Sequence, residues 1–346
     1  MTSQIRLRFI DTWRAIAVTM VIAAHLGQNT DFARKLNEIG GSFVTSYGLL
    51  GVFIFFFISG YVVSQTALRE VTKNNTISLS GFYIRRLYRI APPLLIYLTT
   101  CLILDKAGVI FFPLSEFIGS ALYLCNSTQQ LAPCGWYAGH TWSLAFEEQF
   151  YLLFPGIFAA IELGRRIHPA AVLTAVLAII PFFLPIPWVG KTGFIIIYTL
   201  FWMGYLFAKH EHILVRTLTR SPAAILISAC LITFFPVGAF DSIALGKYYK
   251  FSYIISIPMM IMASSLPSGI IGKFFNNKPI AYIGRISYSI YLWQQLATSP
   301  LFHESSLAVQ FSAIALVIFF CAASFHLIEK PLIDIGRRRS MTSRWF

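Results

Sequence analysis

The feature that most constrains this chain is a series of long apolar segments separated by short segments rich in lysine and arginine. A membrane-spanning helix needs about 20 apolar residues, and several segments meet or approach that length. Charged residues make up 12% of the chain, against about 25% in soluble domains. The sequence therefore predicts an all-α bundle of about ten transmembrane helices. The apolar segments cover residues 9–28, 47–66, 90–110, 142–161, 170–188, 192–208, 222–238, 251–267, 280–300 and 307–328.

The distribution of basic residues predicts the orientation of this bundle. With a cytoplasmic N-terminus, twenty lysines and arginines lie on the inner side and six on the outer side. The positive-inside rule favours this arrangement, with both termini in the cytoplasm. The net charge of +13 then reflects topology and attraction to anionic lipids or ligands, and it requires no nucleic acid. We expect residues 1–346 to form a single transmembrane domain without an appended soluble domain. The first apolar segment is expected to be retained, because Arg14 interrupts it and no cleavage site follows.

Arg14 and His25 lie eleven positions apart in the first apolar segment. At about 100° and 1.5 Å per residue, they share one helix face and lie roughly 16 Å apart along the axis. Ionisable groups within a span usually face protein or water and are functional, so this pair is expected to line the two ends of a buried passage. The alternative is structural: Arg14 extends to the inner headgroups, paired with Asp11, and His25 lies at the outer interface.

The stretch HTWSLAFEEQFYLLFP, residues 140–155, places two carboxylates near the start of an apolar helix. A carboxylate near an imidazole stabilises the imidazolium of a general base. We therefore expect Glu147 to assist His25. A carboxylate that serves helix packing alone is the alternative, and it is favoured for Glu148, which points to another face. Four residues share the face of Glu147 by their i, i+4, i+7 and i+8 spacing: Ser143, Glu147, Phe150 and Tyr151.

A basic cluster in the stretch SGFYIRRLYRIAPPL, residues 80–94, precedes the pair Pro92 and Pro93, which predicts the start of a helix. The planar guanidinium group suits phosphate oxygens. Ordinary positive-inside charge is the alternative, and the basic tail at residues 336–340 is interpreted in that way. The cluster contains three arginines within five residues: Arg85, Arg86 and Arg89.

Two further features leave alternatives open. Cys125 and Cys134 both fall in a predicted outer segment, where an oxidising compartment would permit a disulfide. Residues 284–295, GRISYSIYLWQQ, are polar for a span, and such side chains serve either hydrogen bonds between helices or a wet cavity.

Together these strings resemble the acyltransferase-3 family, bacterial integral-membrane enzymes that move acyl groups from acyl-coenzyme A to extracytoplasmic acceptors, usually sugars. The resemblance runs through the whole chain in the order of the family. It is carried by the spacing of Arg14 and His25, by GVFIFFFISGYV, FYIRRLYRIAP, TWSLAFEEQFYL and ISYSIYLWQ, and by EKP at residues 329–331.

The resemblance implies transfer of an acyl group, acetyl on family grounds, to a hydroxyl in the bacterial inner membrane. The donor substrate would be acyl-coenzyme A (acetyl-coenzyme A), with no metal. The acceptor would be a lipid-linked or surface carbohydrate such as the O-antigen of lipopolysaccharide or an exopolysaccharide. Many family members carry a histidine where this chain has Gln294, so no acid–base role is expected there. The implied site residues are His25 as the catalytic residue, Arg14 as a donor-site partner, Arg85, Arg86 and Arg89 as phosphate contacts, and Glu147 at the acidic position of the family.

Several alternatives to this function stay open, whereas a purely structural assembly subunit is disfavoured by His25 together with Glu147. A proton-coupled transporter or exporter uses the same intramembrane arginine, histidine and glutamate, although the chain lacks matching halves with broken helices. An acyltransferase could also act on a small secreted metabolite. Within acyl transfer, general-base catalysis by His25 and an acyl-histidine intermediate are both compatible with the residues. The oligomeric state is not predicted.

Overall fold

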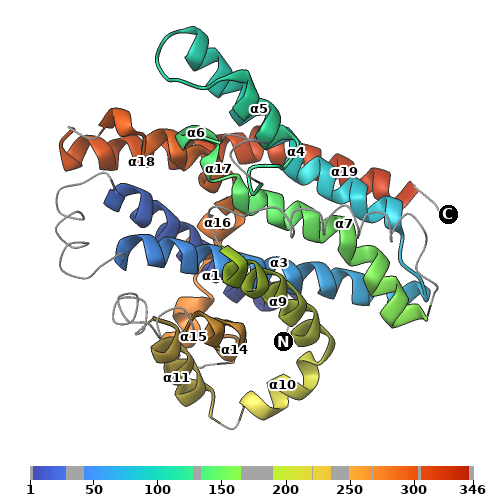
Figure 1. Ribbon diagram of the computed structural model, residues 1–346. Coiled ribbons are helices and arrows are strands. Elements are labelled where there is room, and N and C mark those ends of the chain that lie inside the picture. The colour runs from blue at the N-terminus through green and yellow to red at the C-terminus, as the bar shows by residue number, and fades with distance from the viewer. Residues whose placement is uncertain are drawn as a thin grey trace. The chain divides into compact units, whose positions relative to one another are not determined.

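The computed structural model describes residues 3–28, 43–127, 134–164, 190–219, 221–234, 249–266, 269–302 and 305–342. Within these ranges the chain is helical and contains no strand, which confirms the all-α prediction (Figure 1). The principal helices are α1 (Ser3–Gln28), α3 (Phe43–Asn74), α4 (Leu79–Lys106), α5 (Leu114–Ala121), α6 (Trp136–Gly139), α7 (Trp142–Leu163), α9 (Gly190–Lys209), α10 (Glu211–Leu218), α11 (Pro222–Phe234), α14 (Tyr253–Ala263), α15 (Gly269–Phe275), α16 (Lys278–Arg285), α17 (Ser287–Ala297), α18 (Leu307–Ser324) and α19 (Lys330–Thr342).

Six stretches of helix in the described residues are long and apolar enough to cross a membrane, or seven if the bent pair α10 and α11 forms one span. The six correspond to predicted segments carried by α1, α3, α4, α7, α9 and the α18–α19 region, so the chain is a multi-pass membrane protein. The predicted segment 170–188 lies outside the described residues. The segments 251–267 and 280–300 form shorter helices. The total of ten and the orientation of the termini therefore stay predictions.

The structure corrects the expected start of the third span. Pro92 and Pro93 lie inside α4, and the helix begins at Leu79. The Ser78 hydroxyl caps it by accepting a hydrogen bond from the Gly81 amide at 3.0 Å. Proline is tolerated inside membrane helices because neighbouring groups satisfy the backbone atoms it releases. The arginine cluster therefore lies within the first three turns of α4 instead of in a loop.

The described chain divides into two compact units. The first comprises residues 1–66, 192–294 and 300–311. In it α1 packs closely on α16. Gly284 permits this approach, since a Cβ atom there would collide with the carbonyl oxygen of Asp11. The Trp13 indole also donates a hydrogen bond of 2.8 Å to the Ser264 hydroxyl. The Thr12 hydroxyl donates a hydrogen bond of 3.1 Å to the carbonyl oxygen of Phe275, 263 positions further along the chain. These contacts fix the orientation of α1.

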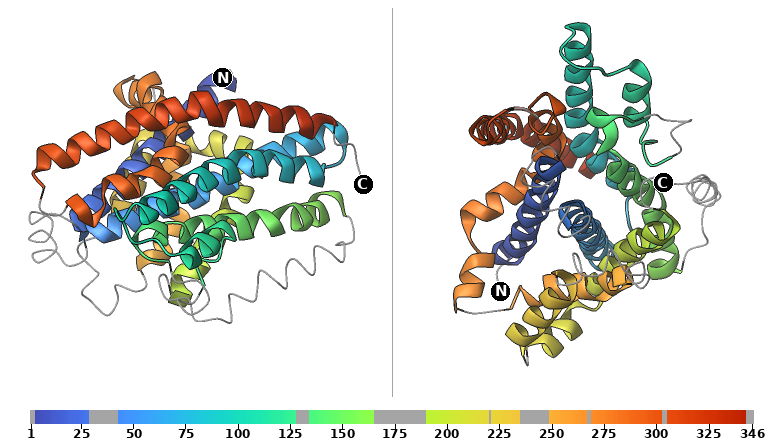
Figure 2. Two further views of the ribbon diagram at one scale, coloured as in Figure 1. Left: turned by 90° about the horizontal axis from the view of Figure 1, so that it is seen from above. Right: turned by 60° about the vertical axis from the view of Figure 1, so that its left-hand side comes forward.

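The second unit comprises residues 67–191, 295–299 and 312–346. In it α4 and α19 run side by side (Figures 1 and 2). Gly336 allows this approach, because a Cβ atom there would lie 2.6 Å from the Cβ atom of Tyr88. The core is aromatic, and a row of buried phenylalanines extends along α7: Phe146, Phe150, Phe154 and Phe158.

A disulfide between Cys125 and Cys134 is present in this unit, which settles the alternative that the sequence left open. Beside it, α5 carries the buried Glu116. The backbone amide of Gly135 donates a hydrogen bond to that carboxylate, but burial is the larger effect and raises the pKa of Glu116. The Tyr97 hydroxyl donates to the Tyr137 carbonyl at 2.6 Å. The segment around the disulfide is thus attached to α4 as well as to α5.

Candidate functional site

The first unit contains a hydrogen-bonded histidine on α1. The Nδ1 atom of His25 and the Oε1 atom of Gln294 on α17 lie 2.9 Å apart. An amide oxygen can only accept, so this geometry assigns the proton to Nδ1 and leaves the imidazole lone pair on Nε2. Neutral histidine in this tautomer is suited to act as a general base through Nε2.

Gln294 is buried, with 1% of its surface exposed. Its helix begins after a break at Ile286, where the α16 backbone ends. One turn before it, Tyr291 packs edge-on against Phe55 with ring centroids 6.2 Å apart. The polar stretch of residues 284–295 thus supplies a hydrogen bond between helices, one of the two expected roles. Sequence reasoning gave Gln294 no acid–base role and did not identify it as the partner of His25. The signal available in the sequence was an amide side chain within an otherwise apolar segment.

Arg14 lies toward the other end of α1, which is uninterrupted from Ser3 to Gln28. Its guanidinium forms an ion pair of 3.2 Å with Asp11, and both side chains are largely buried, with 16% and 14% of their surface exposed. The tight packing of Gly284 against the Asp11 backbone holds the carboxylate that orients Arg14. The pairing with Asp11 belongs to the structural alternative. The burial favours the functional one, because an arginine extended to the headgroups would be exposed.

The second unit holds Glu147, which accepts a hydrogen bond from the Tyr151 hydroxyl one turn along α7. The shared face predicted from their spacing is therefore confirmed. Above the Tyr151 ring lies the Arg86 guanidinium, 4.6 Å from the ring centroid. Glu147 and His25 belong to different units, so assistance of His25 by Glu147 stays a prediction.

The three arginines of α4 occupy different environments. Arg85 pairs with Glu70 at 3.2 Å, and Arg86 lies over Tyr151 with a further contact to the Phe82 ring at 5.8 Å. Arg89 is half-buried. Arg85 and Arg86 are thus engaged by protein groups, and a phosphate would have to compete with these contacts. Phosphate binding by the cluster stays a prediction.

A groove in the second unit lies between α4 and α7 and has a volume of about 410 Å³. We call it the α4–α7 groove. Glu148 lines it, and its Oε1 atom is buried with no hydrogen-bond partner among the described residues. Burial, with smaller contributions from the carboxylates of Glu148 and Glu147, raises the pKa of Tyr123, which also lines the groove. The other lining residues are Tyr83, Ile84, Arg86, Leu87, Ile90, Ala91, Leu94, Leu95, Ala121, Tyr151 and Leu152.

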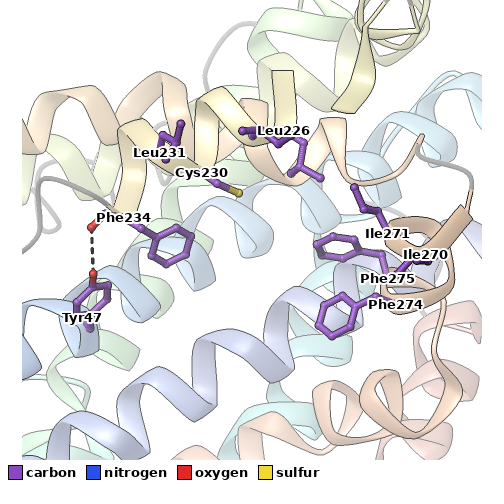
Figure 3. A pocket seen from close by; sticks show the side chains of 10 residues that line it. Tyr47, Leu226, Cys230, Leu231, Phe234, Ile270, Ile271, Phe274 and Phe275 are labelled. Atoms are coloured by element: carbon purple, nitrogen blue, oxygen red, sulfur yellow. Dashed lines mark hydrogen bonds between the residues drawn. The ribbon is translucent and has the colours of Figure 1, made fainter. Parts of the chain in front are cut away.

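A larger pocket, of about 730 Å³, lies in the first unit and is almost entirely apolar (Figure 3). Figure 3 shows side chains of α11 and α15 around it. The Tyr47 hydroxyl donates to the carbonyl of Phe234 at 3.0 Å. Neither a carboxylate nor an imidazole lines the pocket, so it offers no general base of that kind. In the described part of the chain, no three histidine, cysteine, aspartate or glutamate side chains gather into a metal-binding group.

The chain is similar to proteins that are named O-acetyltransferases. A family model described as an acyltransferase domain, acyltransferase-3, matches residues 7–328. The peptidoglycan O-acetyltransferase OatA of Listeria monocytogenes is 27% identical over 94% of this chain and 56% of its own length. The O-acetyltransferase OatA of Staphylococcus aureus is 28% identical over 94% of this chain and 57% of its own length. The chain thus spans somewhat more than half the length of these curated relatives. No solved structure matches it.

Proposed function

Because this chain belongs to the acyltransferase-3 family and is therefore an acyltransferase, we propose that it moves an acyl group, most simply acetyl, from acyl-coenzyme A to a carbohydrate hydroxyl outside the cytoplasm. The observation that carries the proposal is the hydrogen bond between His25 and Gln294. A half-buried imidazole with a fixed tautomer, in a chain of this family, is suited to accept the proton of an attacking hydroxyl.

The proposed chemistry takes place at Nε2 of His25. As the acceptor oxygen bonds to the thioester carbonyl carbon, Nε2 takes the hydroxyl proton. The carbon–sulfur bond then breaks, and the coenzyme A thiolate leaves and takes the proton from the imidazolium. Gln294 keeps Nδ1 protonated throughout, so Nε2 is the nitrogen that takes the proton and gives it up in each cycle. An acyl-histidine route would use the same Nε2 atom as the nucleophile.

Arg14 is proposed to act at the donor end of the same helix. The spacing along α1 is roughly 16 Å, so a donor that contacts Arg14 with its polar part needs an extended arm to present its thioester at His25. The pantetheine arm of coenzyme A is such a group. Asp11 holds the Arg14 side chain at 3.2 Å, which reduces the entropy lost when a ligand binds.

The location and the acceptor are also proposals. The Cys125–Cys134 disulfide supports an outer, oxidising location for that segment and hence the proposed orientation in the bacterial inner membrane. A cell-surface carbohydrate fits this orientation, and O-antigen, exopolysaccharide and peptidoglycan all present hydroxyls. The name of the Listeria relative favours peptidoglycan among them.

Acetyl transfer from radiolabelled acetyl-coenzyme A by membranes containing the protein tests the proposal. His25→Ala should lower the transfer rate by about 10²–10⁴-fold, the usual contribution of a general base, and a nucleophilic histidine would give at least as large a loss. Thr19→Ala is the matched control on α1, because Thr19 lies on a different helix face and its hydroxyl donates to the Ala15 carbonyl in its own helix. Full activity of His25→Ala at normal protein level would refute the assignment. Solute flux without acetyl-coenzyme A consumption would favour a transporter.

A further inference from the structure

We propose that Gln295 is a positioning residue for the pair of His25 and Gln294. Its two hydrogen bonds with Trp136 fix the last turn of α17, and with it the direction in which the Gln294 side chain points. The inference rests on the proposed function, since it specifies how the imidazole that acts as the base is kept oriented. Gln295 acts through its neighbour in the chain instead of on the reacting atoms.

Gln295 and Trp136 are joined by two hydrogen bonds of opposite direction. The Gln295 amide nitrogen Nε2 donates to the Trp136 carbonyl at 2.8 Å, and the Trp136 indole Nε1 donates to the Gln295 carbonyl at 3.1 Å. We call these two bonds the Trp136–Gln295 clamp. Gln295 is buried, with 3% of its surface exposed. Loss of either bond is costly in such a place, because the desolvation of the remaining polar group is then not offset.

The clamp acts at the end of α17, and helix ends fray. Carbonyls in the last turn of a helix lack the amide donor that would normally lie four residues further on. The helix ends at Ala297, and the Ser299 amide donates to the Leu296 carbonyl at 3.3 Å. The Gln295 carbonyl accepts from the indole of Trp136 instead. The indole thus replaces the helical donor and fixes the backbone of the last turn.

Gln294 and Gln295 are successive residues of one helix with different partners. The bond between Gln294 and His25 lies within the first unit, and the clamp lies within the second. Successive residues of an α-helix point about 100° apart, so the two glutamine side chains face different elements. A rotation of the last turn by one position would take the Gln294 amide away from the imidazole. The clamp opposes that rotation.

The short helix α6, which carries Trp136, is itself attached to the rest of the second unit. It is one turn long, so its position depends on bonds to other elements. The disulfide ends two positions before Trp136. The Tyr97 hydroxyl of α4 donates to the Tyr137 carbonyl at 2.6 Å. The hydroxyls of Tyr137 and Ser299 are hydrogen-bonded at 2.7 Å, which links α6 to the segment after α17 as well.

A clamp that only stabilises the fold is the alternative, and the two roles predict different kinetics. A purely structural role lowers the amount of folded enzyme, and its effect on the rate does not depend on the residue at position 294. A positioning role acts through Gln294. Loss of the clamp and of the Gln294 amide together should then lower the rate little more than either loss alone.

A double-variant cycle in the reconstituted full chain distinguishes the two roles. Trp136→Phe removes the indole donor but keeps an aromatic ring. It should lower kcat for acetyl transfer, measured per folded protein, by about tenfold, as expected for one lost hydrogen bond. The KM for acetyl-coenzyme A should stay the same. In the Trp136→Phe protein, Gln294→Leu should lower kcat by no more than about twofold further. Multiplication of the two single effects would overturn the proposal.

A second clamp variant and a matched control complete the cycle. Gln295→Met removes the other bond with little change in shape, and it provides the same test if Trp136→Phe does not fold. Gln149→Met is the control, because the Gln149 amide donates to the Asn126 side chain at 3.1 Å in the same unit, and neither of these residues belongs to α17. Its effect on kcat should be small and should multiply with that of Gln294→Leu. A control that behaves like Gln295→Met would contradict the proposal.

Nitrogen-15 NMR of the histidine-labelled full chain in nanodiscs tests the positioning without any activity. The signals of His25 are those that His25→Ala lacks. The parent protein should show neutral His25 with the proton on Nδ1, whereas Trp136→Phe and Gln295→Met should show a mixture of the two tautomers. Unchanged His25 signals in both variants would overturn the inference. Absence of acetyl transfer by the parent protein would remove the proposed function, and the NMR signals would still decide whether the clamp orients the imidazole.

Discussion

The Nδ1 atom of His25 and the Oε1 atom of Gln294 lie 2.9 Å apart although 269 positions separate the two residues in the chain. This hydrogen bond assigns the proton to Nδ1 and thereby determines which nitrogen can act as a base. A glutamine fixes the tautomer as a carboxylate would, but it carries no charge and stabilises the imidazolium less.

We expect Gln294→Glu to change the pH dependence of acetyl transfer. A carboxylate at this position favours the imidazolium, so a higher pH is needed to form the basic imidazole. The acidic limb of the pH profile of kcat/KM should move up by about one unit or more. Gln294→Leu should lower kcat without moving that limb in the same direction. An unchanged profile for Gln294→Glu would exclude a direct influence of Gln294 on the base.

We expect Arg14→Lys to weaken donor use. Lysine keeps the positive charge but lacks the planar fork that pairs with Asp11 and with phosphate or carbonyl oxygens. The KM for acetyl-coenzyme A should rise about tenfold, corresponding to the loss of about 1.4 kcal/mol of binding, while the KM for the acceptor stays the same. Steady-state kinetics with each substrate varied in turn measures this. A rise confined to the acceptor KM would mean that Arg14 contacts the acceptor, which would contradict its assignment to the donor.

We expect Gly284→Ala to destabilise the first unit. The added Cβ atom would collide with the backbone oxygen of Asp11, so α16 must move away from α1. Overpacking of this kind costs about 1–3 kcal/mol, and the thermal unfolding midpoint in detergent should fall. Gly139→Ala is the matched control, since its Cβ atom would lie at an ordinary 3.8 Å from the nearest atom, the Cys134 carbonyl oxygen. Equal midpoints for the two variants would contradict the close contact.

We expect Glu116→Gln to alter stability in a pH-dependent manner. Burial raises the pKa of Glu116 in the folded protein. A raised folded-state pKa contributes stability that is complete below the unfolded value of about 4.3 and is lost as pH rises through the folded value. Glu116→Gln should therefore be more stable than the parent protein at pH 8, and this advantage should disappear as pH falls toward 4. Thermal unfolding of both proteins across that pH range measures this difference in stability. A difference that does not change with pH would contradict the prediction.

Part of the candidate site was predictable from the sequence because it depends on local geometry. The 3.6-residue period of the helix places Tyr151 on the face of Glu147, and the structure confirms a hydrogen bond between them. The same period places Arg14 and His25 on one side of α1. These relationships follow from spacing alone. The start of α4 was predicted wrongly, because proline usually begins a helix in water, whereas Pro92 and Pro93 lie within a membrane helix.

The contacts between distant segments were not predictable. Arg85 was expected to be available for phosphate, but Glu70, fifteen positions earlier, pairs with it. Glu148 was favoured as a packing carboxylate, and its buried, unpartnered oxygen became evident only from the cavity beside it. A spacing pattern gives the face of a helix on which a side chain lies, but it does not give the element that packs against that face.

The sequence by itself determined that this chain is a helical membrane protein with an arginine and a histidine on its first span, because hydrophobic length and helical period are local properties of consecutive residues. Only the tertiary structure decided that Gln294 orients His25 and that Gly284 packs against the backbone of Asp11, the partner of Arg14. These contacts depend on the packing of helices that are hundreds of positions apart in the chain. That packing is determined by side-chain shape and by the need to satisfy each buried polar atom.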